Sequence, residues 1–153
     1  QSLGVYDSKW ILPVAETLKN LGAHKALVFH SNDGLDEISS ADKTLVAELN
    51  NGNISEYEID PKAFDVYQNN LEDLQINSPS DSLKLIQATF RNEDFLSGKN
   101  ITALNPAAVV YVSGQTDNFL QAFEIAMNVL ESGKAQKKLD ELISFSRKFD
   151  EST

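Results

Sequence analysis

The residues of this chain best suited to chemistry are three acids that stand close together, Asp33, Asp36 and Glu37. They come shortly after an apolar run, residues 26–29. Magnesium is bound in proteins by one or two carboxylates, and it completes its shell with water and substrate phosphates. The acids therefore suit a site where a divalent cation is held against a phosphate-bearing substrate.

A solvated turn explains the same three acids. Asp33 and Gly34 form an Asp-Gly pair, which is typical of turns. Two carboxylates about 5 Å apart repel by less than about 1 kcal/mol in water, but by about 3 kcal/mol at an effective dielectric of about 20. An exposed turn therefore tolerates the acids, whereas a cleft requires a compensating cation or a raised pKa. The residue pattern alone leaves both interpretations open.

Because Asp36 and Glu37 are adjacent in the chain, only some backbone conformations let both side chains bind the same ion. Neighbouring side chains point to opposite faces of a strand and lie about 100° apart on a helix. The pair can therefore meet a single ion only from a turn or from the start of a helix. An EF-hand calcium loop does not fit, because Gly34 and Leu35 follow Asp33 where further ligands are required.

Other candidate residues have simpler structural explanations. His30 stands at the end of an expected strand, where a hydrogen-bonded structural role is the simpler interpretation, and His24 is expected on an exposed turn. Trp10 and Tyr111 have apolar neighbours and are expected in the core. The chain has no cysteine, and the motifs of serine hydrolases, zinc proteases, dinucleotide-binding loops and Walker-type loops are absent.

Composition indicates one folded domain over residues 1–153. A hydrophobic content of 41% is typical of a globular protein, and a formal net charge of −10 weighs against binding to a phosphate backbone. No apolar run approaches the roughly 20 residues that a spanning helix needs, and the first residues lack the pattern of a signal peptide. We therefore expect no nucleic-acid partner, no membrane partner and a cytoplasmic location.

The order of the expected elements predicts an α/β fold with a central sheet flanked by helices. Strands are predicted at residues 3–6, 25–29, 44–49 and 54–59, the last two joined by an Asn51-Gly52 hairpin turn. Helices are predicted over residues 8–21, 82–90 and 119–130, with a last one around residues 139–143. Asn105 before Pro106 predicts another helix start, although residues 109–112 fit a strand equally well. Ligands of such sheets bind beyond the carboxyl ends of strands, where the acids stand.

Four segments, taken in order, resemble one enzyme family. They are "LGVYD" at the start, "LKNLGAHKALVFHSNDGLDEIS", "ALNPAAVVYVSG" and the helix ending "LESGKA". Together they resemble the C-terminal part of the anthranilate phosphoribosyltransferases. The resemblance implies a fold of the nucleoside phosphorylase/phosphoribosyltransferase type, with this chain as its C-terminal α/β domain and most of the N-terminal helical domain lacking.

The resemblance also implies an activity and a metal. Members of the family transfer phosphoribose from 5-phosphoribosyl 1-pyrophosphate to anthranilate in tryptophan biosynthesis, with Mg2+ as cofactor. By resemblance, Asp36 and Glu37 are the magnesium-binding pair, and their role is to hold the ion against the departing pyrophosphate. Asp33 and His30 are given no such role, and no catalytic or substrate-binding residue is assigned. A homodimer is one assembly that the resemblance allows for the intact protein.

Several functional segments of that family have no counterpart here. By resemblance, its glycine-rich pyrophosphate loop, its Lys-His-Gly-Asn segment and its anthranilate-contacting arginine precede the matching region. We therefore expect this chain to be part of a longer enzyme and to show no transfer activity alone, because the groups that orient the substrates are missing. Two alternatives stay open: a related nucleoside phosphorylase or phosphoribosyltransferase paralogue, and a non-catalytic metal-binding α/β module.

Overall fold

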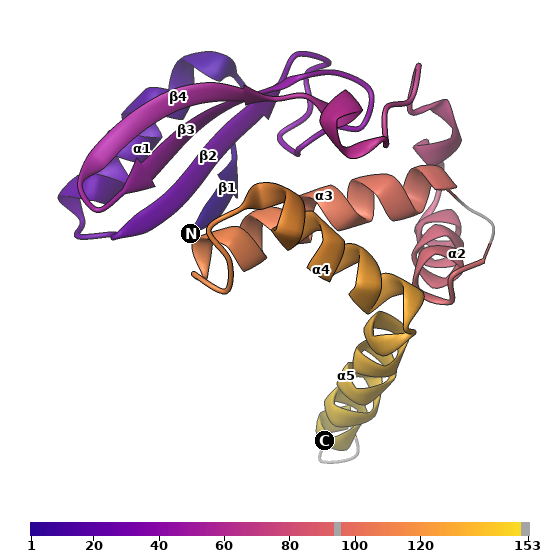
Figure 1. Ribbon diagram of the computed structural model, residues 1–153. Coiled ribbons are helices and arrows are strands. Elements are labelled where there is room, and N and C mark those ends of the chain that lie inside the picture. The colour runs from indigo at the N-terminus through magenta and orange to yellow at the C-terminus, as the bar shows by residue number, and fades with distance from the viewer. Residues whose placement is uncertain (94–95, 151–153) are drawn as a thin grey trace.

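A four-stranded sheet and five α-helices make up the computed structural model, which describes residues 1–93 and 96–150 (Figure 1). The strands are β1 (Ser2–Gly4), β2 (Lys25–Ser31), β3 (Thr44–Asn50) and β4 (Asn53–Ile59). The helices are α1 (Ile11–Asn20), α2 (Pro79–Phe90), α3 (Leu96–Val112), α4 (Phe119–Glu131) and α5 (Lys134–Asp150). Short 3-10 helices lie at Ser8–Trp10, Pro61–Phe64 and Glu72–Leu74.

The sheet follows the order of the sequence. β1 pairs in parallel with β2, and β2, β3 and β4 pair antiparallel in turn. The parallel pair needs a crossover, which α1 supplies. The turn between β3 and β4 has φ +48° at Asn51 and +83° at Gly52, the two positive values that a tight hairpin turn requires. The predicted hairpin and the predicted α/β class are both confirmed.

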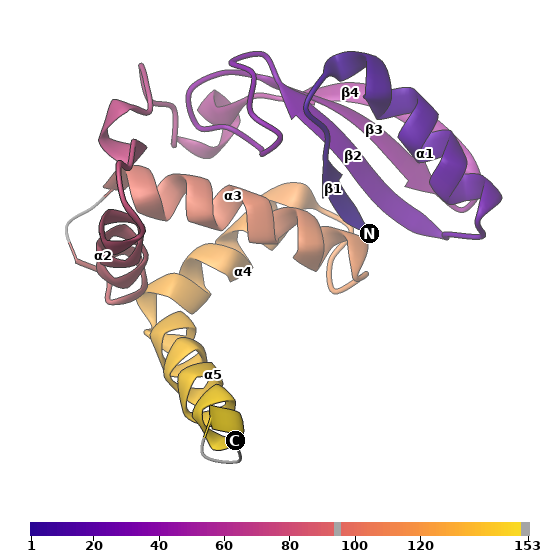
Figure 2. The ribbon, with the colours of Figure 1, turned by 180° about the vertical axis from the view of Figure 1, so that it is seen from behind.

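Helices cover both faces of the sheet (Figures 1 and 2). On one face α1 buries Ile11, Ala15 and Leu18 against Ala26, Val28, Ala47 and Leu49. On the other face α3 packs on the sheet and α4 packs on α3, within one larger apolar cluster. Its fully buried members include Leu27, Ile38, Ala103, Leu104, Ala107, Ala108 and Ala122. The small alanines let α3 approach the strands closely, whereas α5 extends away from the sheet in both views.

The prediction that a helix begins at Asn105 is wrong. Both Asn105 and Pro106 lie inside α3, and residues 109–112 continue that helix. Pro106 has no N–H to donate to the carbonyl of Thr102, which normally weakens or kinks a helix. Here the residues just beyond the proline, Ala107 and Ala108, are fully buried against the sheet, so tertiary packing holds the helix together across it.

The prediction that Trp10 belongs to the core is also wrong. Its side chain is 41% exposed, and its indole N–H donates to the hydroxyl of Tyr6 at 3.0 Å. Tyr111 is only half-buried, and its hydroxyl donates to a charged partner in the sheet. That partner is Glu48 of β3, which is itself buried.

The Glu48 carboxylate accepts hydrogen bonds from two tyrosine hydroxyls. Tyr111 of α3 donates to one carboxylate oxygen at 2.8 Å, and Tyr57 of β4 donates to the other at 3.0 Å. The ammonium of Lys25 lies over the Tyr111 ring, 3.8 Å from its centroid. This polar cluster attaches the C-terminal end of α3 to the sheet.

The polar cluster should make the protein sensitive to alkaline pH. Burial and the neighbouring Glu48 raise the pKa of Tyr111 to about 12, and the same two causes raise the pKa of Tyr57. Unfolded tyrosines ionise near a pKa of about 10, so above that pH the unfolded state loses protons that the folded state retains. The free energy of unfolding should therefore fall as pH rises from about 10 towards 12.

Denaturant unfolding at a series of pH values measures this fall. Replacing both tyrosines, as Tyr57→Phe and Tyr111→Phe, should flatten the alkaline limb of the profile. The exposed Tyr67→Phe serves as control and should leave the limb as it is. An unchanged alkaline limb in the double variant would contradict the prediction.

Candidate functional site

Backbone hydrogen bonds fix the acidic turn at the point where it leaves the end of β2. The N–H of Ser31 donates to the carbonyl of Leu35 at 2.9 Å, and the N–H of Asn32 donates to the carbonyl of Lys43 at 2.9 Å. Gly34 has φ +94°, a conformation that favours glycine, and its N–H donates to the carbonyl of Ser31. The turn therefore has a defined shape at the end of the strand.

Asp33 shapes the turn from within. One of its carboxylate oxygens accepts the hydroxyl of Ser39 at 2.5 Å, and the other accepts the N–H of Leu35 at 3.3 Å. Ser39 is fully buried, and its own N–H donates to the hydroxyl of Thr44, which is buried too. Both carboxylate oxygens of Asp33 are thus used in hydrogen bonds within the turn.

Asn105 of α3 holds the segment directly after the acids. Its Oδ1 accepts the N–H of Ile38 at 2.8 Å, and its Nδ2 donates to the carbonyl of the same residue at 3.1 Å. The Ile38 side chain is fully buried in the cluster between the sheet and α3. Both the backbone and the side chain of Ile38 are therefore fixed to the helix.

Gly4 of β1 holds the same segment from the other side. A Cβ atom at this position would lie 1.6 Å from the carbonyl oxygen of Asp36. Real Cβ atoms do not approach a backbone oxygen so closely, so any other residue at position 4 must displace the strand or the turn. The backbone of Asp36 is therefore packed directly on the glycine.

Asp36 and Glu37 themselves reach the surface at this edge. Both side chains are exposed, and in the described part of the chain neither takes part in an ion pair. Partial burial of the Glu37 carboxyl raises its pKa, and the nearby charge of Asp36 adds to the rise. Glu37 also lines a groove of about 350 Å3 along α3, together with Ile101, Thr102, Asn105 and Pro106. The Glu37 carboxylate therefore lies beside a groove, and neither it nor the exposed Asp36 carboxylate has a cationic partner among the described residues.

The described residues contain no cluster of three or more His, Asp or Glu side chains placed to hold a metal ion. A full protein cage is therefore not built here. Magnesium needs no such cage, because it typically takes one or two carboxylates and completes its shell with water and substrate oxygen.

His30 is a structural residue in this fold. Its Nδ1 donates to the carbonyl of Val5 at 2.8 Å, which ties the end of β2 to the chain leaving β1. His24 lies exposed, as expected. Neither histidine joins the acidic pair.

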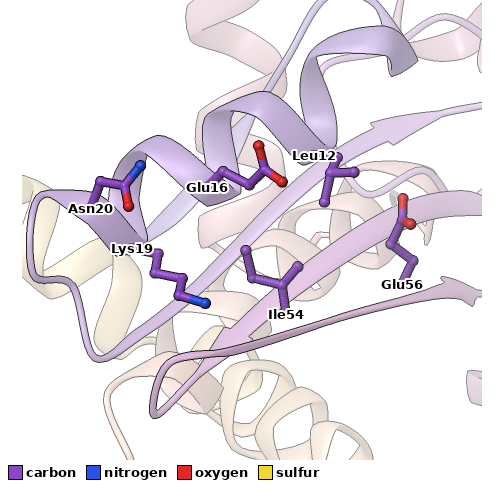
Figure 3. Close-up of a pocket in the computed structure, with 6 residues that line it drawn as sticks. All are labelled: Leu12, Glu16, Lys19, Asn20, Ile54 and Glu56. Atoms are coloured by element: carbon purple, nitrogen blue, oxygen red, sulfur yellow. The ribbon is translucent and has the colours of Figure 1, made fainter.

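A second hollow lies between α1 and β4, on the other face of the sheet (Figure 3). It has a volume of about 490 Å3, and Figure 3 shows Lys19 extending from α1 toward Ile54 of β4. Its remaining lining residues are Leu12, Glu16, Asn20 and Glu56. Neither Asp36 nor Glu37 lines it, so it is separate from the acidic turn.

Sequence reasoning misses the two residues that hold the acids. An Asn-Pro pair is typical of a helix start, so the local pattern gives Asn105 a capping role instead. Gly4 carries a signal that is available, because a glycine inside a strand often marks a close backbone approach.

The class of protein follows from comparison with known families. The chain belongs to the glycosyl transferase family, whose a/b-domain model matches residues 1–136. Within the family its relatives are anthranilate phosphoribosyltransferases, as the sequence segments predicted. The enzyme of Marinomonas sp. (strain MWYL1) is 42% identical over 150 residues, and that of Ruthia magnifica subsp. Calyptogena magnifica is 44% identical over 143 residues.

Solved structures give the same result for the fold. Anthranilate phosphoribosyltransferase from Thermus thermophilus superposes with a TM-score of 0.84 at 28% identity over 94% of this chain. The enzyme of Saccharomyces cerevisiae in complex with PRPP and Mg shares the fold, with a TM-score of 0.80 at 18% identity over 94% of this chain. The predicted C-terminal α/β domain is therefore confirmed.

The chain spans only part of the length of these relatives. The match takes in 97% of this chain but 43% of the Marinomonas protein, and 94% of this chain but 42% of the Ruthia protein. The shares of the Thermus and Saccharomyces chains are 42% and 41%. No helix among the described residues is long and apolar enough to cross a membrane.

Proposed function

We propose that this chain is the magnesium-presenting α/β domain of an anthranilate phosphoribosyltransferase, which transfers phosphoribose from 5-phosphoribosyl 1-pyrophosphate to anthranilate. The observation that carries the proposal is the acidic turn of a family member, fixed at the end of β2 with Asp36 and Glu37 facing outward. A cytoplasmic location belongs to the proposal, since so highly charged a substrate does not cross membranes unaided.

The two acids fit magnesium. Both offer carboxylate oxygens, the ligands that this hard cation prefers, and both lack a cationic partner in the described residues. The anchored backbone keeps them at one edge of the sheet. A bound magnesium ion would neutralise the negative charge that develops on the departing pyrophosphate.

The protein's own contribution is to place the two carboxylates before the substrate arrives. Ile38 and Asp36 are fixed by α3 and β1, so the turn needs little reordering on binding. The groove beside Glu37 is lined by Ile101, Thr102, Asn105 and Pro106, which places apolar and polar side chains of α3 next to that carboxylate. Groups that orient anthranilate are proposed to come from the portion of the relatives that this chain does not span.

Neutralising the acid pair tests the proposal. The variant with both Asp36→Asn and Glu37→Gln should bind Mn2+, used as a measurable substitute for Mg2+, about tenfold more weakly or worse, because two ionic attractions are lost. Titration calorimetry with and without pyrophosphate provides the measurement, and pyrophosphate should strengthen binding to the unchanged chain. Asp42→Asn, which neutralises another exposed acid in the same loop, is the matched control.

Two outcomes would contradict the proposal. One is an equal affinity for Mn2+ in the double variant and in the Asp42→Asn control. The other is substantial transfer activity of this chain alone with both substrates and magnesium, because the chain would then contain all of the substrate-orienting groups.

A further inference from the structure

Both the oxygen and the nitrogen of the Asn105 side-chain amide form hydrogen bonds. Its Oδ1 accepts the Ile38 N–H, one Nδ2 hydrogen is donated to the Ile38 carbonyl, and Nδ2 also donates to the carbonyl of Ile101 at 3.1 Å. An amide has two N–H donors, and both are used here. The bond to the carbonyl of Ile101, in the same helix, sets the direction of the side chain. The other two hydrogen bonds pair with the backbone N–H and C=O of Ile38.

Only an asparagine makes this pairing at this distance. An amide carries a donor and an acceptor side by side, so it pairs with Ile38 as a neighbouring strand would. Aspartate would set a carboxylate oxygen against the Ile38 carbonyl, and alanine would leave both backbone groups without their partner. Glutamine keeps the pairing groups but places them one methylene further out.

The pairing acts on the residue directly after the acid pair. Ile38 follows Glu37 in the chain, and the Asp36 carbonyl on the other side packs against Gly4. Asp33, Ser39 and Thr44 hold the turn at other points, and none of them bonds to the backbone of residues 36–38. Among the described side chains, Asn105 therefore has the most direct control over the direction in which Glu37 leaves the backbone.

We propose that Asn105 is a positioning residue, which sets the Asp36 and Glu37 carboxylates for binding a divalent cation. The inference rests on the proposed function, since it assigns a role in preparing that site. Asn105 itself does not touch the ion; it acts by fixing the backbone of Ile38. Groups that orient metal ligands typically change metal affinity by about 10- to 100-fold when they are removed.

Two measurements on the same variants test the proposal. In Asn105→Ala the amide hydrogen of Ile38 should exchange with solvent about tenfold faster, because its acceptor is gone. The affinity of the chain for Mn2+ should fall by about tenfold. Asn105→Gln, which retains both pairing groups, should lose less affinity than Asn105→Ala and serves if the alanine variant does not fold.

Asn100→Ala is the matched control. Asn100 lies in the same helix, is buried, and donates through Nδ2 to the carbonyl of Val66 at 3.4 Å, away from the acidic turn. Its loss should lower the thermal stability but leave the affinity for Mn2+ unchanged. Equal affinities in Asn105→Ala and Asn100→Ala, with the unchanged chain binding normally, would overturn the positioning role alone. Failure of the unchanged chain to bind Mn2+ would overturn the proposed function, and the inference with it.

Discussion

Replacing Gly4 by alanine should lower the free energy of unfolding by about 3 kcal/mol, the upper range for forcing extra volume into packed structure. The added Cβ would stand 1.6 Å from the Asp36 carbonyl oxygen. The neighbouring atom is backbone, which cannot rotate away as the end of a flexible side chain does. The clash can be relieved only by moving β1 from β2 or by lifting the acidic turn.

Chemical denaturation with urea measures the loss, and Leu3→Ala is its control. Leu3 precedes Gly4 in the same strand and is 41% exposed, so its truncation changes the strand without a clash. Affinity for Mn2+ distinguishes the two ways of relieving the clash. If the turn is lifted, Gly4→Ala weakens Mn2+ binding as well as stability. Unfolding free energies that are equal in the two variants would show that position 4 tolerates a side chain.

Features set by neighbours in the sequence could be predicted from the sequence. The Asn51-Gly52 turn, the places of the strands along the chain and the position of the acids after β2 depend on local backbone preferences and on apolar patterning. Asn105, which holds the residue directly after the acids, could not be found this way. Asn105 is 67 residues from Ile38, and its role exists only once α3 packs on the sheet.

The misplaced helix start has the same physical origin. An asparagine before a proline is a local signal for the beginning of a helix, and it is correct when nothing outweighs it. In α3 the alanines beyond Pro106 bury against the strands, so the packing offsets the hydrogen bond that the proline cannot make. The same packing places Asn105 in the middle of the helix, facing the turn.

A second large loss of stability is expected at the polar cluster of Glu48, Tyr57 and Tyr111, which also attaches α3 to the sheet. Glu48→Ala should lower the free energy of unfolding by about 3 kcal/mol, since two tyrosine hydroxyls lose their acceptor and a void replaces the carboxylate. For a domain of this size that corresponds to a fall in Tm of roughly 6 to 12 °C. Glu48→Gln should lose about 1 kcal/mol, because the amide can still accept one hydroxyl and donate to the other.

Glu58→Ala is the control for Glu48→Ala, because it deletes the same side chain from the same hairpin at an exposed position. Glu58 pairs with Lys43 at 2.9 Å on the surface, and exposed ion pairs contribute about 1 kcal/mol or less. A double-mutant cycle between Glu48→Gln and Tyr111→Phe then isolates the bond that joins β3 to α3. Losses of equal size in Glu48→Ala and Glu58→Ala would mean that the buried carboxylate contributes no more than a surface charge. A clear difference would mean that the buried Glu48 carboxylate holds the C-terminal end of α3 on the sheet through Tyr111.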